Sequence, residues 1–375
     1  MAPKRPYGAG AILRPNGHEL VESPALNPAG ADRTLYAALD LGTNSCRMLI
    51  AEPVGNQFKV VDSFSKSVRL GAGLERSGRL SRSSILRTLQ ALQVCRQKLK
   101  RHRVRKMRLV ATEACRRASN GADFMARVQR ETGLRLNIID PQEEAQLAVV
   151  SCAPLVSPQT DQLLVVDIGG GSTELVWIDL TRVPPSERAR SIMRMHMGFQ
   201  MPCGEQSQAK VVDWISVPLG VATLREQFND VEDDSARFAL MSWFFEENLA
   251  EFAPYKDEQP RKGFQIVGTS GTVTTVAASH LGLRRYDRNK VDGLTMTSDE
   301  IDAVIRRYVK LGEEGRRRDP RIGEDRQALI MSGAAILQAL LRCWPTDRLS
   351  VADRGLREGM LYAQMAADGV LYEGP

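Results

Sequence analysis

Three short runs of apolar residues follow one another along the chain from residue 34. Each run is too short for a typical helix and is bounded by turn residues, a pattern typical of strands. Gly55 and Asn56 separate the second run from the third, so the runs predict an antiparallel meander. The runs cover residues 34–42, 46–53 and 57–65.

Helices with intervening strands follow the meander. Residues 81–102 place apolar side chains on one side of a helix after a serine-rich start, and Gly133 closes a second helix at 120–133. Pro141, in the first turn, predicts a third helix over 141–153. Two further strands are predicted, at 106–114 and at 135–140.

The second half of the chain begins with the same order of elements. Residues 162–180 predict a strand, a glycine-rich turn and a second strand. Thr297 or Ser298 is expected to cap a later helix. Beyond residue 180 we predict a strand at 189–198, strand–turn–helix units at 264–278 and 349–366, and helices within 215–228 and at 236–252, 295–311 and 326–344.

An internal repeat relates the two halves. A shift of 127 residues superposes the turn after the first strand on the turn inside 162–180. The shift places Asp40 on Asp167, Gly42 on Gly169 and Ser45 on Ser172. We therefore expect a duplicated α/β fold whose two lobes face each other across a cleft.

The composition is that of a globular protein and excludes several classes. The chain has 375 residues, 43% hydrophobic and 26% charged, which is enough for two domains. No apolar run reaches membrane-spanning length, and residues 1–33, rich in Pro, Gly and Ala, predict a disordered leader without a signal core. The six cysteines and four histidines are scattered, which argues against a metal cluster and favours reduced thiols in the cytoplasm.

The net charge of +6 is modest but locally concentrated. Eight of the thirteen residues at 96–108 are Lys or Arg. Such a run is either the solvated face of a helix or an electropositive rim for a polyanion, and the sequence leaves both interpretations open.

In each of the two matched turns, a carboxylate is followed by glycine, which has no side chain to cover the backbone. Glycines behind Asp40 and Asp167 let backbone N–H groups approach a ligand. An acid beside such a turn repels a phosphate unless a cation bridges them, and Mg²⁺ characteristically binds one or two carboxylates together with phosphate oxygens. Asp40, Asp167 and Glu174 are therefore candidate metal ligands. The alternative is a tight hairpin in which each Asp caps its own turn.

A third glycine-containing loop, GTSGTVTT at 268–275, follows a strand and opens a helix. The amides and the dipole at a helix N-terminus favour a bound anion. The loop is not a Walker loop, because no Lys follows its second glycine, and the turn at 167–172 does not match the dinucleotide-binding pattern.

Seven ordered motifs, spread over residues 35–366, resemble those of the exopolyphosphatase / guanosine pentaphosphate phosphatase family. They read ALDLGTNSCRMLI, VATEACRRA, EEAQLA, VVDIGGGSTELV, SVPLGVATL, VGTSGTVTT and GLREGMLYA. The resemblance implies the duplicated actin-like (ribonuclease H-like) fold. It also implies a phosphoanhydride hydrolase that uses Mg²⁺, with Mn²⁺ as an alternative, to remove the terminal phosphate of inorganic polyphosphate. The runner-up activity is hydrolysis of pppGpp at its 5′ end to ppGpp, which would link the chain to the stringent response.

The resemblance assigns roles to individual residues. Glu144 would orient and deprotonate the attacking water, with Glu143 as a fallback, although from the sequence alone this acidic pair is better explained by the helix dipole. Arg116 matches the family's phosphate-clamping arginine. The residues implied in holding phosphates are Asn44, Ser45, Gly169, Gly170, Gly171, Ser172, Gly268, Thr269, Ser270, Gly271 and Thr272.

Domain boundaries and partners follow from the same resemblance. Domain I is expected to comprise 34–141 and about 353–375, and domain II 142–352, without the C-terminal helical extension of longer relatives. Many relatives carry a His where this chain has Asp292. We expect a cytoplasmic homodimer that binds polyphosphate or pppGpp, with no membrane and no specific nucleic acid as partner. Two other classes stay open, a polyphosphate- or alarmone-sensing protein with little turnover and an actin-like kinase.

Overall fold

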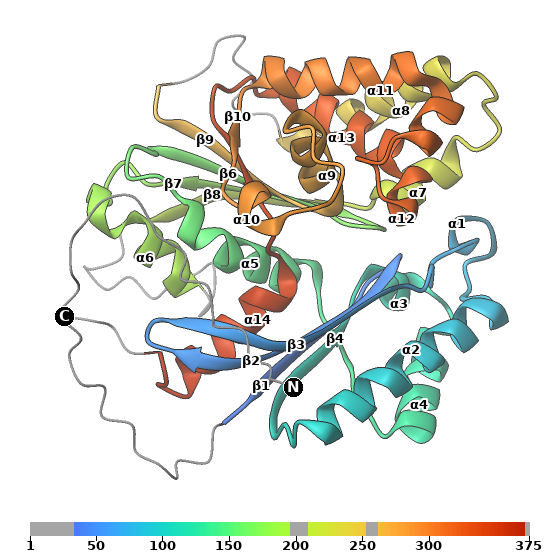
Figure 1. The fold of residues 1–375 in the computed structure, drawn as a ribbon, viewed down its shortest axis with the longest axis vertical. Coiled ribbons are helices and arrows are strands. Elements are labelled where there is room, and N and C mark those ends of the chain that lie inside the picture. The colour runs from blue at the N-terminus through green and yellow to red at the C-terminus, as the bar shows by residue number, and fades with distance from the viewer. Residues whose placement is uncertain (1–33, 196–208, 253–261, 372–375) are drawn as a thin grey trace, which may run out of the picture. The chain divides into compact units, whose positions relative to one another are not determined.

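The structure, a computed structural model, describes residues 34–195, 209–252 and 262–371. The predicted leader at 1–33 lies outside these residues. The described residues belong to one unit that begins at Thr34. Within it, two β-sheets, each covered by helices, form a lower and an upper lobe in Figure 1.

The first sheet contains the predicted meander. Its strands have the order β3-β2-β1-β4-β5, with β1–β2 and β2–β3 antiparallel and β1–β4 and β4–β5 parallel. The strands are β1 (Tyr36–Leu41), β2 (Ser45–Val54), β3 (Gln57–Ser67), β4 (Lys106–Ala111) and β5 (Asn137–Ile138).

The second sheet repeats this topology. Its order is β10-β11-β9-β6-β7-β8, in which β6, β7, β8, β9 and β11 take the places of β1 to β5. The pairings have the same directions, antiparallel for β6–β7 and β7–β8 and parallel for β6–β9 and β9–β11. The strands are β6 (Gln162–Ile168), β7 (Thr173–Asp179), β8 (Lys210–Val217), β9 (Phe264–Thr269), β10 (Thr295–Met296) and β11 (Leu349–Ala352). The predicted duplicated fold is confirmed.

The matched turns have the same backbone geometry. The amide of Gly42 donates to the carbonyl of Ser45 at 3.0 Å, and the amide of Gly169 donates to that of Ser172 at 2.9 Å. Positions 127 residues apart therefore close equivalent hairpins, so the weak sequence identity at these turns reflects a structural repeat.

Helices cover both faces of the first sheet. Two of them, α2 and α4, pack against each other, while α14 packs on β1 and against α5. The helices are α1 (Leu74–Ser77), α2 (Arg82–Arg101), α3 (Glu113–Arg117), α4 (Gly121–Thr132), α5 (Pro141–Cys152) and α14 (Leu356–Ala367), and the short 3₁₀ turn Ala153–Leu155 follows α5.

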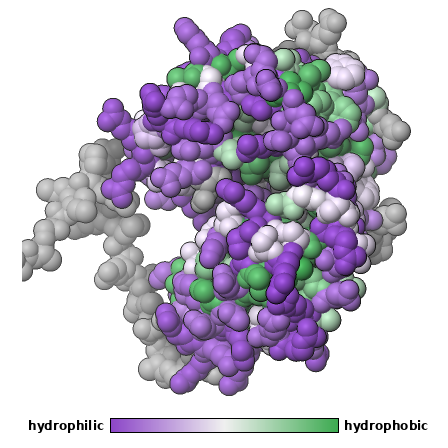
Figure 2. Space-filling model, turned by 90° about the vertical axis from the view of Figure 1, so that its right-hand side faces the viewer, coloured by the Kyte–Doolittle hydropathy of each residue, from purple (hydrophilic) through white to green (hydrophobic). Residues whose placement is uncertain are grey.

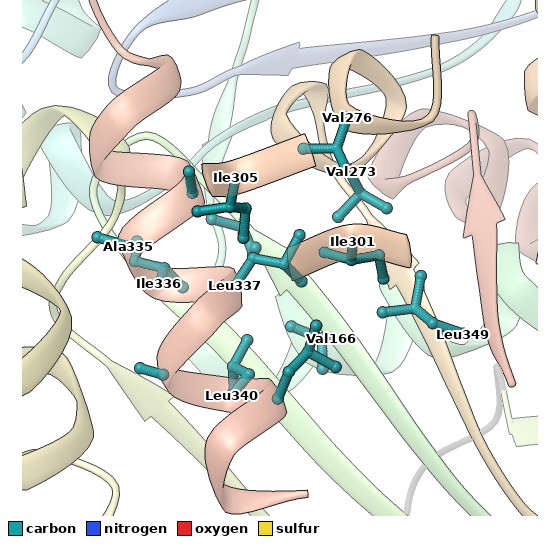
Figure 3. Packing of buried hydrophobic residues seen from close by; sticks show 14 of the residues in the cluster. Val166, Val273, Val276, Ile301, Ile305, Ala335, Ile336, Leu337, Leu340 and Leu349 are labelled. Carbon is teal, nitrogen blue, oxygen red and sulfur yellow. The ribbon is translucent and has the colours of Figure 1, made fainter. Parts of the chain in front are cut away.

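The larger core lies beneath the helices of the second sheet. In Figure 3, Leu337 and Leu340 of α13 lie toward Val166 of the sheet, and Ile301 and Ile305 of α11 lie on the same side of α13. The helices are α6 (Arg188–Arg194), α7 (Val221–Gln227), α8 (Asp234–Glu247), α9 (Gly271–His280), α10 (Arg288–Val291), α11 (Ser298–Arg318), α12 (Glu324–Gln327) and α13 (Ile330–Cys343), with 3₁₀ turns at Pro185–Glu187 and Ala250–Phe252. Across the described residues, none of the helices has the length and apolar character needed to cross a membrane.

Three predicted elements differ from the structure. Residues 196–198 of the strand predicted at 189–198 lie outside the described residues, and the described part contains α6 instead. Its buried side chains, at Arg188, Ser191, Ile192 and Met195, fall at helical spacing. The strand predicted at 106–114 ends at Ala111, and α3 begins two residues later. The helix predicted at 326–344 is interrupted between α12 and α13, where the carbonyl of Ala328 accepts a hydrogen bond from Arg225.

The basic run at 96–108 lies at the end of the first sheet that is remote from the turns. Lys106 begins β4 beside Tyr36, whereas the turn follows Leu41 at the other end of β1. Three of its cations are paired, Lys98 with Asp62, Lys106 with Asp368 and Arg108 with Glu143. The run therefore forms no rim at the turns, which favours the solvated-face interpretation.

Neutralising the run is expected to have little effect on turnover. The triple variant Arg101→Gln, Arg103→Gln, Arg105→Gln should keep kcat/KM for short and long polyphosphates within about twofold of the native value, because these side chains are solvated surface groups. Phosphate release from chains of two defined lengths measures this. A selective loss with long chains would restore the polyanion interpretation.

Candidate active site

A cleft between the lobes gathers the turns of both sheets. The ends of β1, β6, β9 and β11 open into it, since strands in equivalent places of the two sheets deliver their carboxyl ends to the same region. Of the predicted residues, the cleft is lined by Asp40, Asn44, Ser45, Glu144, Asp167, Gly169, Gly170, Gly171, Ser172, Thr269, Ser270, Gly271 and Thr272. Arg116, Glu143, Glu174 and Gly268 are not among its lining residues.

Asp40 and Asp167 occupy equivalent positions one residue before the end of β1 and β6. Burial raises the pKa of both carboxyls. Arg47 opposes this effect at Asp40, whereas Glu174 and Asp40 add to it at Asp167. The two acids therefore share a site in which excess negative charge is costly unless a cation is added.

Glu144 projects into the cleft from the N-terminal part of α5. The carboxylate of Asp140 caps this helix by accepting from the amide of Glu143 at 2.8 Å, and Pro141 occupies the first turn. Glu144 is 9% exposed, and its pKa is raised well above the usual value, first by burial and then by Glu174. A carboxyl that is buried and faces a polar cleft is typical of a general base.

Glu143 points away from the cleft, to the sheet surface, where it pairs with Arg108. Neighbouring residues of a helix lie on different sides, so only one acid of the EEA motif faces the cleft. The geometry supports Glu144 over Glu143 as the acid available to a substrate.

Arg116 does not line the cleft but binds the carboxylate of Glu144. Its Nη1 and Nη2 each lie 3.3 Å from Oε2 of Glu144, while Nη2 donates to Glu113 at 2.6 Å and Nη1 to the carbonyl of Ile139 at 2.6 Å. The guanidinium is thus engaged by protein groups, which fits a role in orienting Glu144 better than direct contact with phosphate.

Glu174 lies beneath the cleft rather than on its surface. It pairs with Asp167 across the β6–β7 hairpin and is 2% exposed. The hydroxyl of Ser216 donates to its Oε1 at 2.9 Å, and burial raises its pKa to about 7. Glu174 therefore adds a second carboxylate beneath Asp167 and raises the pKa of that residue.

The turn Gly169–Ser172 needs its glycines because another turn lies against it. A Cβ on Gly170 would lie 3.1 Å from the amide nitrogen of Asn44, and one on Gly171 would overlap Thr43. The carbonyls of Gly169 and Gly170 accept from the N-terminus of α7 at 3.0 and 2.8 Å. The amide of Gly169 closes the turn, so the N–H groups of Gly170 and Gly171 are the candidates to donate to a ligand, as a phosphate-binding turn requires.

The third loop opens α9. The hydroxyl of Ser270 accepts from the amides of Thr272 and Val273 at 3.0 Å each, so the helix is capped and its remaining N-terminal dipole faces the cleft. Gly268 instead lies within β9, paired with Val351 and Val166. It is a sheet residue, which explains why it does not line the cleft.

Four arginines line the cleft that the sequence interpretation did not assign. They are Arg47, Arg326, Arg354 and Arg357. Arg47 pairs with Asp40 across the β1–β2 hairpin. Burial, followed by the nearby Arg357 and Arg326, lowers its pKa to about 10. The hairpin register could have found Arg47, and the motif GLREGMLYA contains Arg357 and directly follows Arg354, whereas Arg326 lies in none of the seven motifs.

Asp292 binds one of these arginines. Its Oδ2 accepts from Nη2 of Arg354 at 2.7 Å and from Nε at 3.0 Å, and its Oδ1 accepts from the amide of Asp353 at 3.0 Å. The carboxylate therefore fixes the loop that follows β11 and directs the Arg354 guanidinium.

Asp292→Ala is expected to raise KM for a phosphate substrate by about tenfold with less effect on kcat. Loss of charge-assisted hydrogen bonds worth about 1.5–3 kcal/mol lets Arg354 leave the cleft wall. Steady-state kinetics measure this effect, and Asp299→Ala, at an exposed position in the first turn of α11, is the control. An unchanged KM would show that Arg354 does not depend on this pair.

A larger pocket of about 530 Å³ adjoins the cleft and shares Thr274, Arg326 and Asp353 with it. Leu283 and Tyr286 contribute apolar surface, and Tyr286 is 53% exposed. An exposed aromatic ring beside a phosphate cleft is a surface on which a nucleobase can stack.

The acids do not form a closed metal cage. No group of three or more His, Cys, Asp or Glu side chains within the described residues has metal-binding geometry. Asp40 and Asp167 nevertheless fit Mg²⁺, which takes one or two carboxylates and completes its shell with water and phosphate oxygens. A cation bound between them would also relieve the electrostatic repulsion between the two carboxylates.

The sequence of this chain matches the profile of a known protein family. The profile of the Ppx/GppA phosphatase family matches residues 49–367. A Ppx/GppA family member from Aquifex aeolicus is 29% identical, the match covers 89% of this chain and 98% of that chain, and the TM-score is 0.69. An exopolyphosphatase from Cytophaga hutchinsonii is 21% identical, with 91% and 100% covered and a TM-score of 0.72, a likeness of fold.

Proposed function

The chain belongs to the Ppx/GppA phosphatase family, a group of hydrolases acting on phosphate compounds, and we propose that it is an exopolyphosphatase. In this proposal it hydrolyses the terminal phosphoanhydride of inorganic polyphosphate and releases orthophosphate. The observation that carries it is the buried Glu144 facing a cleft lined by two matched turns and four arginines.

Glu144 acts as the general base in this proposal. Its carboxylate accepts a proton from a water that attacks the terminal phosphorus in line with the departing chain. Arg116, at 3.3 Å, keeps the carboxylate oriented and offsets part of the effect of burial on its pKa. The backbone amides of Gly170 and Gly171 would stabilise the charge on the phosphoryl oxygens.

Asp40 and Asp167 would hold a Mg²⁺ ion, supported by Glu174. When bound, the ion supplies charge neutralisation between the carboxylates and the phosphate oxygens. The arginines of the cleft wall would bind the following phosphates of the chain, since guanidinium groups match phosphate oxygens in geometry and charge. The homodimer and the cytoplasmic location expected from the sequence stay predictions.

Phosphate release from polyphosphates of defined length and from pppGpp, with and without Mg²⁺, tests the proposal. We expect Mg²⁺-dependent release of orthophosphate from polyphosphate. Binding of polyphosphate without release would instead favour the sensing protein, and transfer of phosphate from ATP to a sugar would favour the kinase.

A second candidate activity is hydrolysis of pppGpp to ppGpp, which the pocket beside the cleft favours. Tyr286→Ala is expected to lower kcat/KM for pppGpp by about tenfold, since base–aromatic stacking contributes about 1–3 kcal/mol. The same variant should leave kcat/KM for polyphosphate unchanged. A parallel loss with both substrates would assign Tyr286 to the stability of the lobe.

A further inference from the structure

Another pocket, distinct from the one that contains Tyr286, shares Thr43 and Asn44 with the cleft. This side pocket has about 160 Å³ and is formed by the segment 67–72 on one lobe and by α7 and residues 328–329 on the other. In Figure 1, α1 and α7 lie on the side that Figure 2 turns to the viewer, and that face is largely hydrophilic. Its size suits a small tetrahedral ion rather than a nucleoside.

Two arginines give the side pocket its positive charge. Arg69 is exposed, and Arg225 is half-buried with its Nη1 donating to the carbonyl of Ala328. Burial lowers the pKa of Arg225, and the positive charges of Arg237 and Arg69 lower it further. Two guanidinium groups at the mouth of a pocket attract an anion.

Glu226 supplies an acceptor in the same pocket. Its Oε2 accepts from the amide of Gly73 at 3.1 Å, whereas its buried Oε1 has no hydrogen-bond partner among the described residues. The cation at that oxygen is Arg76, whose Nε lies 3.8 Å away. An orphaned acceptor between arginines suits an oxyanion that still carries a proton, because the ligand can donate to Glu226 while it accepts from the guanidinium groups.

A thin wall separates the side pocket from the cleft. It is formed where Thr43 and Asn44 of one lobe meet Gly170 and Gly171 of the other. The hydroxyl of Thr43 is buried without a hydrogen-bond partner in the described part of the chain. Because the two sides of the wall belong to different lobes, a small separation of the turns would join the two spaces.

We propose that the side pocket is a second phosphate site, which receives orthophosphate as it leaves the cleft past Thr43. The source of the phosphate rests on the proposed function. Hydrolysis at the end of a chain frees the innermost phosphate, and the remaining chain still fills the cleft. This product leaves either after the chain withdraws or through another opening, and the side pocket provides that opening.

The chemistry of the pocket selects orthophosphate among anions. Monohydrogen phosphate presents oxygens to Arg69 and Arg225 and a hydroxyl to Glu226. Sulfate has the same shape but lacks the proton, so its oxygen would face the carboxylate. Inner phosphates of a chain also lack this proton, which keeps the substrate out.

Equilibrium dialysis of the full chain against inorganic phosphate tests the site. The Glu144→Gln background prevents consumption of tripolyphosphate, which is added in excess to occupy the cleft. We expect one equivalent of orthophosphate to stay bound, and this equivalent to be lost in the double variant Arg69→Gln, Arg225→Gln. The matched control, Arg130→Gln with Arg135→Gln, removes the same charge from an exposed surface and should retain it. Circular dichroism shows whether each variant is folded, and the single variant Arg69→Gln, at an exposed side chain, should already weaken binding.

Glu226→Gln distinguishes this site from a general anion site. An amide can donate to sulfate, so sulfate should compete for the equivalent in the Gln variant and not in the parent. An equivalent that survives in the double variant, or that tripolyphosphate displaces, would overturn the proposal. Dialysis counts bound phosphate without turnover, so failure here and failure of polyphosphate hydrolysis are separate results.

Discussion

Glu144→Gln is expected to lower phosphate release from polyphosphate by a factor of about 10²–10⁴, the usual contribution of a general base. The amide has nearly the same shape as the carboxylate but cannot accept the proton of the attacking water. Arg116 keeps its pairing with Glu113 at 2.6 Å, so the local structure should persist. Phosphate release at saturating polyphosphate measures the effect.

Glu143→Gln is the matched control, because this acid precedes Glu144 on the same helix but pairs with Arg108 outside the cleft. It should retain activity close to that of the native protein. Equal losses in the two variants would point to a shared effect on α5, and full activity of Glu144→Gln would remove this residue from the mechanism.

Asp167→Asn is expected to raise the Mg²⁺ concentration for half-maximal activity by about 10–100-fold. The substitution removes one of the two carboxylates proposed to hold the ion and preserves the size of the side chain. Asp167 lies two residues before the turn Gly169–Ser172 and lines the cleft together with it. Initial rates over a series of Mg²⁺ concentrations measure the shift.

Asp123→Asn, on the exposed surface of α4, provides the control for a change of net charge. Its Mg²⁺ dependence should match that of the native protein. An Asp167→Asn variant with native Mg²⁺ dependence and reduced kcat would place Asp167 in the chemical step rather than at the ion. Addition of EDTA to the native protein should abolish release altogether if the ion is required.

The repeat in the sequence was sufficient to predict the duplicated topology. Asp40 and Asp167 mark equivalent turns, and the apolar runs around them fix the inner strands, because buried strands and hairpin turns have strong local signals. The short helix α6 had no such signal. Met193, Met195 and Met197 alternate in the sequence as in a strand, and only the tertiary packing of Ile192 and Met195 shows the helical face.

The candidate site was predictable where a motif carries the residue and not where tertiary structure does. Glu144 and the glycine turns lie in recognisable motifs and line the cleft. Arg116 lies in a motif too, but its direction depends on Glu113 and Ile139, which only the fold brings to it. Arg357 lies in the motif GLREGMLYA but was not assigned to the site, and Arg326 reaches the cleft from a segment outside the motifs, so no sequence spacing points to it.

The pairing across the two matched hairpins breaks the symmetry of the duplication. Asp40 faces Arg47 across the first hairpin, and Asp167 faces Glu174 across the second. Arg47 and Glu174 are themselves 127 residues apart, so one ancestral position carries opposite charges in the two lobes. The two aspartates are consequently unequal although their backbone frames match. A cation beside Asp167 would offset the charges of two neighbouring carboxylates, whereas Arg47 already offsets part of the charge of Asp40.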